Sequence, residues 1–457
     1  MSQSDSSTVP PAKTFSPTPV AHSPVADAHL IRYAGPFIPG LVVRAQGAYI
    51  YDDQGREILD FTSGQMCAIL GHNHPDVVAA ITEACRNVIH LHSSQLSPPV
   101  IELAQLIASQ LPKQLQKMIF LSTGSESNEA ALRMAKLFRG GFEVYAFSGS
   151  WHGMTGGASA STYAFGRQGY GPTLPGVQAI PTPNCYRCPI RHCRDKCDMT
   201  CLEAGFDMTD RQTVGAPAAF IFEPIISAGG MIELPPGYLT RLRQLCDARG
   251  LLMIADEAQT AFGRMGLLFG YQQEPGFVPD FLTMSKSLGG GLPLSATLTS
   301  AEIEETCYSR GFIHATSHVS DPMPAAVGVA LLKVIARDKL VDNVKKIGDY
   351  LKTRLKELQL RHECIGDIRG RGLLLGMEIV SDREKRTPAP ALGTAISERC
   401  YELKLSMNIV RLPAVGSIFR IAPPFTLTRA QADSAVAILD QAIGECVAKQ
   451  RAGTPAK

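Results

Sequence analysis

The sequence predicts an α/β protein: a large domain with a mostly parallel, seven-stranded type of sheet covered by helices, and a smaller α+β domain made from both chain ends. Between about residues 75 and 330, short apolar runs alternate with helical periodicity, which is typical of parallel strands joined by helices. The chain has 457 residues and 45% hydrophobic content, which is too long for one hydrophobic core. Two packed lobes are therefore expected.

The two chain ends set the predicted boundaries. Residues 1–26 are rich in Ser, Thr and Pro, so we predict a disordered tail. Lys13 is the only Lys or Arg in this tail, which does not match an Arg-rich mitochondrial presequence and favours the cytoplasm. The other predicted segments are 27–75 and 333–447 for the smaller domain, 76–332 for the large domain with a Cys-rich insertion at 183–205, and 448–457 for a second tail.

Strand-like segments support both domains. Residues 47–60 resemble a strand, an Asp/Gly turn and a second strand, and 372–380 and 418–422 are strand-like near the other end. In the large domain, the predicted strands are the apolar runs 118–121, 144–147, 219–222, 251–255 and 281–284. Polar, acidic or Gly residues follow each run, at the sheet edge where open α/β sheets bind ligands.

The composition favours small-molecule partners. The net charge is +2, which gives no strong case for nucleic acid or an anionic membrane surface. No stretch approaches the roughly 18 uninterrupted apolar residues of a membrane-spanning helix. We therefore expect neither a nucleic-acid nor a membrane partner.

Small and aromatic residues follow the first two predicted strands. Thr123, Gly124 and Ser125 open a helix, where backbone N–H groups can approach a phosphate, although an ordinary helix cap is the alternative. Trp151 is the only tryptophan. It lies among small residues and could stack on a flat cofactor, or it could be a core residue.

An acid and a lysine follow two later strands. The carboxylate of Asp256 needs a cationic partner, which a protonated pyridine nitrogen would supply, with a helix-capping role as the alternative. Lys286 precedes three glycines; partial burial would lower the pKa of its amine and make it a Schiff-base nucleophile, whereas alone it could be a surface lysine. Together with the phosphate cradle and the stacking ring, these residues match the needs of pyridoxal 5'-phosphate (PLP).

At this point the chain resembles the class III (subgroup II) aminotransferases of PLP fold type I, over nearly all of residues 29–445. Within them it looks most like the 2,2-dialkylglycine decarboxylases. The runs that carry the resemblance are Phe61–Met66, Ser122–Gly124, Ser150–Gly156, Asp256–Thr260, Val319–Pro322, Gly366–Gly376 and Phe419–Pro424.

The resemblance implies a role for individual residues. Gln65 resembles the glutamine that holds a departing carboxylate perpendicular to the cofactor ring, with a loop amide as the alternative. Arg420 resembles the arginine that binds the substrate carboxylate, with an exposed or salt-bridged strand arginine as the alternative. These two join Lys286 and Trp151 as the implied catalytic residues. The implied cofactor residues are Thr123, Gly124 and Ser125 at the phosphate, Trp151 over the ring, Asp256 at the ring nitrogen, Gln259 at the ring hydroxyl, Lys286 as the Schiff-base lysine, and Ser317 at the phosphate of a neighbouring subunit.

The resemblance also implies an alkali cation, K+ or Na+, beside the site. Its oxygen ligands would come from Leu91, Ser93, Ser317, Val319 and Asp321, a set that suits a hard cation, with ordinary loop and cap residues as the alternative. Ser317 stands where the family usually has threonine, so a hydroxyl is kept. Its contact with a neighbouring subunit would require a homodimer or a homotetramer.

Two features depart from the resembled family. Ala228 stands where we expect the decarboxylases to have a serine near the substrate carboxylate. The second is a cysteine cluster with His192 inside it, whose spacing permits a tetrahedral zinc site but also fits unligated thiols. The cluster consists of Cys185, Cys188, Cys193, Cys197 and Cys201.

The leading hypothesis is a decarboxylating transaminase that converts 2,2-dialkylglycines such as 2-aminoisobutyrate, with the 2-oxo acid pyruvate, to a ketone, CO2 and L-alanine. Such an amino acid has no α-hydrogen, so CO2 would leave instead of a proton, and Lys286 would move protons in both half-reactions. The nearest alternative is a non-decarboxylating aminotransferase acting on an amine or ω-amino acid. A catalytically silent binding protein is a third, which the intact Lys286 and Asp256 disfavour.

Overall fold

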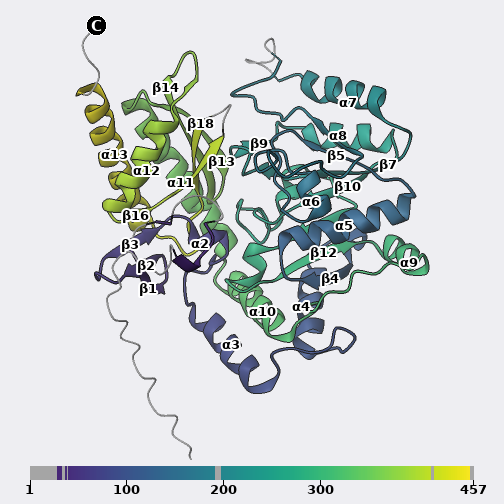
Figure 1. Cartoon of the computed structure of the whole chain (residues 1–457). Coiled ribbons are helices and arrows are strands. Elements are labelled where there is room, and N and C mark those ends of the chain that lie inside the picture. The colour runs from purple at the N-terminus through teal and green to yellow at the C-terminus, as the bar shows by residue number, and fades with distance from the viewer. Residues whose placement is uncertain (1–27, 33–36, 39, 191–196, 413–415, 453–457) are drawn as a thin grey trace, which may run out of the picture.

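A computed structural model describes residues 28–32, 37–38, 40–190, 197–412 and 416–452 (Figure 1). The predicted tail at 1–26 lies outside these residues, as do His192 and Cys193 of the cysteine cluster. None of the helices in the described part of the chain is long and apolar enough to cross a bilayer. The expected cytoplasmic location stays a prediction.

A seven-stranded sheet forms the centre of the larger lobe. β12 pairs antiparallel with both of its neighbours, and the remaining neighbours in the sheet pair parallel. The predicted α/β fold class is thereby confirmed. In spatial order the strands are β4 (Lys117–Leu121), β12 (Ser295–Thr299), β11 (Phe281–Met284), β10 (Leu252–Asp256), β7 (Pro217–Phe222), β5 (Glu143–Phe147) and β6 (Val177–Ile180).

Alternate side chains of a strand point to opposite faces of a sheet, and in this sheet both faces are buried. On β7, Ala219 and Ile221 join the apolar cluster under helices α5 (Gly124–Arg139) and α9 (Ala301–Ser309). Phe220 and Phe222 point the other way, into the cluster that includes helices α7 (Thr200–Gln212) and α8 (Tyr238–Asp247). The near-continuous apolar runs of the sequence follow from this double burial.

Two smaller sheets form the second lobe (Figure 1). The short strand β16 pairs parallel with β3, with Leu405 opposite Leu59, so the two chain ends share one sheet as expected. The first sheet has the order β1 (Val42–Gln46), β2 (Tyr49–Asp52), β3 (Glu57–Asp60) and β16 (Leu405–Ser406). The second has the order β13 (Ile365–Arg371), β14 (Leu374–Asp382), β18 (Gly416–Ile421) and β17 (Asn408–Leu412), with β15 (Thr387–Pro388) beside β14.

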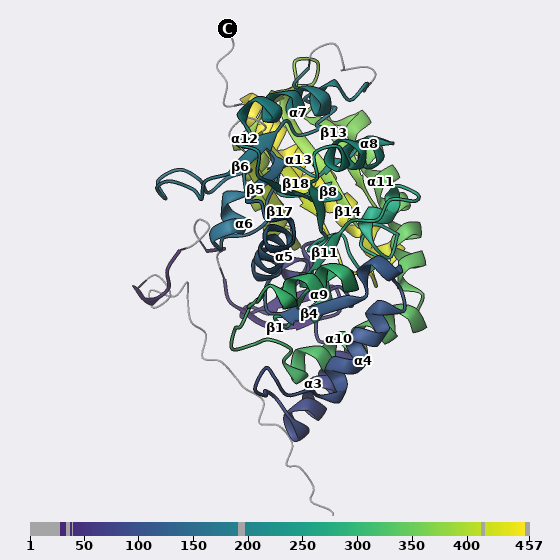
Figure 2. The ribbon, with the colours of Figure 1, turned by 90° about the vertical axis from the view of Figure 1, so that its right-hand side faces the viewer.

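The remaining helices cover these sheets or connect the lobes. In Figures 1 and 2, α3, α4 and α10 lie together at one end of the large sheet. α11 and α12 lie against the five-stranded sheet, and α13 packs on these two helices. Their bounds are α2 (Ser63–Met66), α3 (Pro75–Asn87), α4 (Pro98–Ala108), α6 (Gly156–Ala160), α10 (Pro322–Arg337), α11 (Leu340–Arg361), α12 (Pro390–Glu402) and α13 (Arg429–Ala452). Short pieces are β8 (Ile225–Ile226), β9 (Ile232–Glu233), η1 (Lys113–Leu115), η3 (Gly270–Gln273) and η4 (Lys286–Gly289).

The predicted domain boundaries stay predictions, and two helices extend across them. α13 continues to Ala452, through residues 448–452 of the predicted second tail, and its apolar side chains before that point pack on the smaller lobe. Helix α7 begins at Thr200, inside the predicted insertion at 183–205, because Leu202 and Phe206 pack into the core beneath it.

Candidate active site

Lys286 lies at the carboxyl end of the central strands. It follows β11 and opens η4 with a φ of 42°, a left-handed conformation that is uncommon for a residue with a side chain. Burial lowers the pKa of its amine, and the nearby Asp256 carboxylate partly offsets this. A desolvated amine of this kind is suited to nucleophilic and proton-transfer chemistry.

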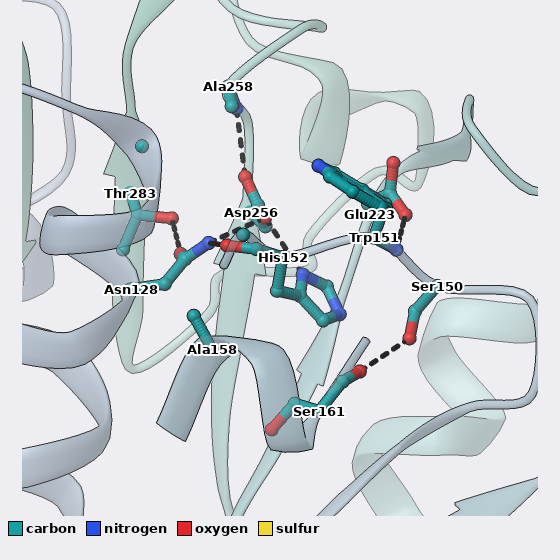
Figure 3. Close-up of polar contacts among 12 residues, drawn as sticks. Asn128, Ser150, Trp151, His152, Ala158, Ser161, Glu223, Asp256, Ala258 and Thr283 are labelled. Atoms are coloured by element: carbon teal, nitrogen blue, oxygen red, sulfur yellow. Dashed lines mark hydrogen bonds and ion pairs between the residues drawn. The ribbon is translucent and has the colours of Figure 1, made fainter. Parts of the chain in front are cut away.

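Asp256 ends the neighbouring strand β10 and is 4% exposed. Its Oδ2 accepts a hydrogen bond from Asn128 Nδ2 at 2.8 Å and lies 2.8 Å from His152 Nδ1, while its Oδ1 accepts from the Ala258 N–H at 3.1 Å. Thr283 Oγ1 in turn donates to Asn128 Oδ1 at 2.6 Å. Figure 3 shows Asn128 and His152 directed toward the carboxylate, which is therefore held in one orientation.

Trp151 lies beside a buried acid that the sequence reasoning did not select. Its main-chain N–H donates to Glu223 Oε1 at 2.9 Å (Figure 3), and the Ser227 N–H donates to Glu223 Oε2 at 3.2 Å. Burial raises the pKa of Glu223 to about 7. The Trp151 ring stacks on Phe165 with ring centroids 4.3 Å apart, so one of its faces is already covered.

Gln259 is held by a hydroxyl that also lies near Ala228. Ser227 Oγ donates to Gln259 Oε1 at 2.7 Å, and Gln259 is 6% exposed. Ala228 itself is buried. Position 228 thus carries no hydroxyl, and the neighbouring Ser227 hydroxyl binds the glutamine.

The predicted phosphate cradle opens α5. Thr123 Oγ1 accepts from the Glu126 N–H at 3.2 Å, which is the capping role weighed as an alternative, and Ser125 Oγ accepts from the N–H groups of Met154 and Thr155 at 3.0 Å. A Cβ at Gly124 would lie 2.7 Å from Ser285 Oγ, so a larger residue there would force the Ser285 hydroxyl to move. The first N–H groups of a helix lack intrahelical partners and favour an anion.

Gln65 and Arg420 line one small pocket, and all of its lining residues come from the smaller lobe. Arg420 Nε donates to Asn408 Oδ1 at 3.1 Å, and burial lowers the pKa of the guanidinium to about 10. The segment that carries Gln65 includes left-handed Ser63 and Met66. The residues lining the pocket are Thr62, Gly64, Gln65, Met66, Asn408, Arg420 and Ala422.

Asp321, one of the predicted cation ligands, contacts two histidines. Asp321 Oδ1 lies 2.5 Å from His90 Nδ1 and its Oδ2 lies 2.7 Å from His318 Nδ1. The two histidines were not selected from the sequence. Ser317 is exposed, and the alkali-cation set of Leu91, Ser93, Ser317, Val319 and Asp321 stays a prediction.

The described cysteines of the cluster lie close enough to affect the pKa of Cys185. Burial and the neighbouring thiols of Cys188, Cys197 and Cys201 raise the pKa of Cys185 to about 12. Among the described residues, one group could hold a metal ion: the ligand atoms of His90, His318 and Asp321 lie within 4.8 Å of one another. This group includes no cysteine. Zinc at the cluster therefore stays a prediction.

Comparison with known proteins points to one family. The sequence pattern of the family described as "Aminotransferase class-III" matches residues 33–443. An uncharacterized aminotransferase of Schizosaccharomyces pombe is 49% identical over 93% of this chain and 95% of its own length. Alanine–glyoxylate aminotransferase 2 homolog 2 of Arabidopsis thaliana is 34% identical over 88% of this chain and 83% of its own length.

A solved structure supports the same conclusion. An amine transaminase from an uncultivated Pseudomonas species, crystallised in a PLP-bound form, superposes with a TM-score of 0.84. It is 28% identical and covers 92% of this chain and 98% of its own.

Proposed function

The chain belongs to the class-III aminotransferase family, and from that premise we propose that it transfers an amino group from an amine or ω-amino acid to a 2-oxo acid. PLP is the cofactor expected for this family. The two relatives described above are both named aminotransferases, which favours this proposal over decarboxylation.

One observation carries the proposal: the buried carboxylate of Asp256 lies at a strand end near the partly buried, desolvated amine of Lys286. A buried carboxylate needs a cationic partner, and a protonated pyridine nitrogen would provide one. Bound PLP supplies an electron sink for breaking a bond at the donor carbon. The residues present fit this group.

The protein residues have separate tasks around that cofactor. Asn128 and His152 orient Asp256, and the Lys286 amine moves a proton at the donor carbon. Gln259 would contact the ring hydroxyl and Trp151 would cover the ring. Arg420 would bind the donor or acceptor carboxylate through its planar fork.

Decarboxylation of 2,2-dialkylglycines is the second candidate function. It is favoured by the pocket in which Gln65 and Arg420 both lie, since a carboxylate bound by Arg420 there would also reach Gln65. Loss of that carboxylate as CO2 requires that it be held out of the plane of the cofactor ring. Gln65 would provide this constraint, whereas simple transamination does not need it.

Two donors that yield the same ketone separate the candidates. Isopropylamine and 2-aminoisobutyrate both give acetone with pyruvate as acceptor, but only the second can release CO2. Alanine from isopropylamine, without CO2 from labelled 2-aminoisobutyrate, supports the first candidate. Equal amounts of CO2 and alanine from 2-aminoisobutyrate support the second. If no alanine forms from isopropylamine, 2-aminoisobutyrate or β-alanine, both candidate functions are overturned.

A further inference from the structure

Arg264 is a fully buried arginine outside the predicted site. It lies in the turns that follow β10, the strand that ends at Asp256. No carboxylate forms an ion pair with it among the described residues, and burial lowers the pKa of its guanidinium to about 9. A desolvated cation without an anion is costly, so its hydrogen-bond acceptors define what it does.

Those acceptors come from segments far apart in the sequence. Nη2 donates to Ser63 Oγ at 3.2 Å, and Nη1 donates to the carbonyl oxygens of Pro423 at 2.5 Å and Leu373 at 3.2 Å. Its guanidinium also lies over the Phe425 ring, 4.7 Å from the centroid. One side chain thus joins the extension of β10 to three parts of the smaller lobe.

Two of these segments carry the residues of the Gln65–Arg420 pocket. Ser63 lies two positions before Gln65, and its Oγ donates to the Ala422 carbonyl at 2.6 Å. Ala422 is itself a pocket residue between Arg420 and Pro423. The guanidinium therefore fixes both sides of the pocket relative to the strand of Asp256.

We infer that Arg264 is a positioning residue that sets the carboxylate-binding side of the site, an inference that rests on the proposed role of Arg420. A lysine could keep the charge but could not direct planar N–H groups at Ser63, Leu373 and Pro423 together. Arg264→Lys should therefore loosen the pocket while the charge remains.

Binding of isobutyrate tests this without catalysis. This carboxylate has the carbon skeleton of 2-aminoisobutyrate but no amine, and its affinity for the PLP-loaded protein is measured by isothermal titration calorimetry. Arg264→Lys should weaken binding about tenfold, the effect of losing one or two hydrogen bonds from a charged group. The kcat/KM for isopropylamine, which has no carboxylate, should change less than about threefold at saturating pyruvate.

Arg369→Lys is the matched control. Arg369 is also buried and crosses between the lobes, with Nε donating to the Gly230 carbonyl at 2.8 Å, but it bonds to none of the pocket residues. Its lysine variant should bind isobutyrate as the parent protein does. Equal weakening in both lysine variants would show a general loss of packing and would overturn the inference.

Two further variants keep the result decisive. If Arg264→Lys does not fold, Ser63→Ala removes one of its acceptors and should weaken isobutyrate binding about threefold. Ser417→Ala, which removes a buried Ser hydroxyl bonded to the Pro390 carbonyl, should not. Arg420→Gln separates the role of Arg420 from that of Arg264. Unchanged isobutyrate binding in Arg420→Gln refutes the role of Arg420. If Arg420→Gln loses binding while Ser63→Ala and Arg264→Lys bind isobutyrate as the parent does, only the role of Arg264 is refuted.

Discussion

Glu223 is a buried acid whose ionisation costs stability. Burial raises its pKa to about 7, against hydrogen bonds from the Trp151 and Ser227 N–H groups that favour the charged form. The pKa in the folded state thus exceeds the ordinary value of 4.5. This group's contribution to stability is complete below the ordinary pKa and is lost as the pH rises through about 7.

Glu223→Gln should remove that pH dependence. Between pH 5 and pH 8 the parent protein should lose on the order of 3 kcal/mol that the variant does not lose. Urea midpoints at both pH values measure the difference. A parent and a variant that respond alike to pH would show that Glu223 is already ionised at pH 5.

Asp256→Asn should lower kcat by about a hundredfold or more, because a neutral amide cannot balance a protonated ring nitrogen. The measurement is steady-state transamination at saturating cofactor. Asp210→Asn is the control, since Asp210 forms a surface ion pair with Arg249 and its loss should change neither kcat nor folding appreciably. A variant at 256 with parental kcat would refute the assigned role.

Residues at strand ends could be predicted from the sequence, whereas their partners could not. Asp256 and Lys286 follow apolar runs, and parallel strands bring such positions to one edge. Asn128 and His152 contact Asp256 across more than 100 positions of sequence, and no local pattern encodes such a contact. Glu223 also follows a run, but nothing in the sequence marks it as the partner of the Trp151 N–H.

At the scale of elements, the strands found from the sequence are those with apolar runs. β12 was missed because its sequence, Ser295–Thr299, is small and polar although fully buried. Two of its three hydroxyls donate to main-chain oxygens, Thr297 Oγ1 to Ser127 and Thr299 Oγ1 to Asp280, whereas the buried Ser295 Oγ has no hydrogen-bond partner among the described residues. β6 was missed because only Ile180 is buried there.

The turn between β13 and β14 should tolerate no side chain at Gly372. This residue has a φ of 57°, and a Cβ there would lie 2.6 Å from the main-chain carbon of Met265. Gly372→Ala should therefore destabilise the protein by about 3 kcal/mol in urea unfolding. Gly444→Ala, in open space on α13, should instead stabilise it by up to about 1 kcal/mol. Equal effects would contradict the close approach.

At the scale of the whole molecule, large apolar side chains are exposed on two neighbouring loops. Leu96 is 79% exposed and Ile89 52% on one loop, and Ile313 is 69% exposed on the other. The contact between His90 and Asp321 joins these loops. Such a surface is typical of a subunit interface.

We therefore expect an oligomer with at least twice the 49.2 kDa chain mass, and Leu96→Glu should shift it toward the monomer. Multi-angle light scattering after size exclusion measures the mass. Leu360→Glu is the control, since Leu360 is 81% exposed on α11 and belongs to neither loop. A parent protein that runs as a monomer would refute the expectation.

The pairing of β3 with β16 also imposes an order on biosynthesis. Leu59 and its partner Leu405 are 346 positions apart (405 − 59), so at usual ribosome speeds β3 waits about 20 to 70 s for its neighbour. All strands of the large sheet emerge before then. The lobe that carries Asp256 and Lys286 can thus mature on the ribosome, while the sheet that precedes Gln65 in the chain is completed only when the chain is nearly finished.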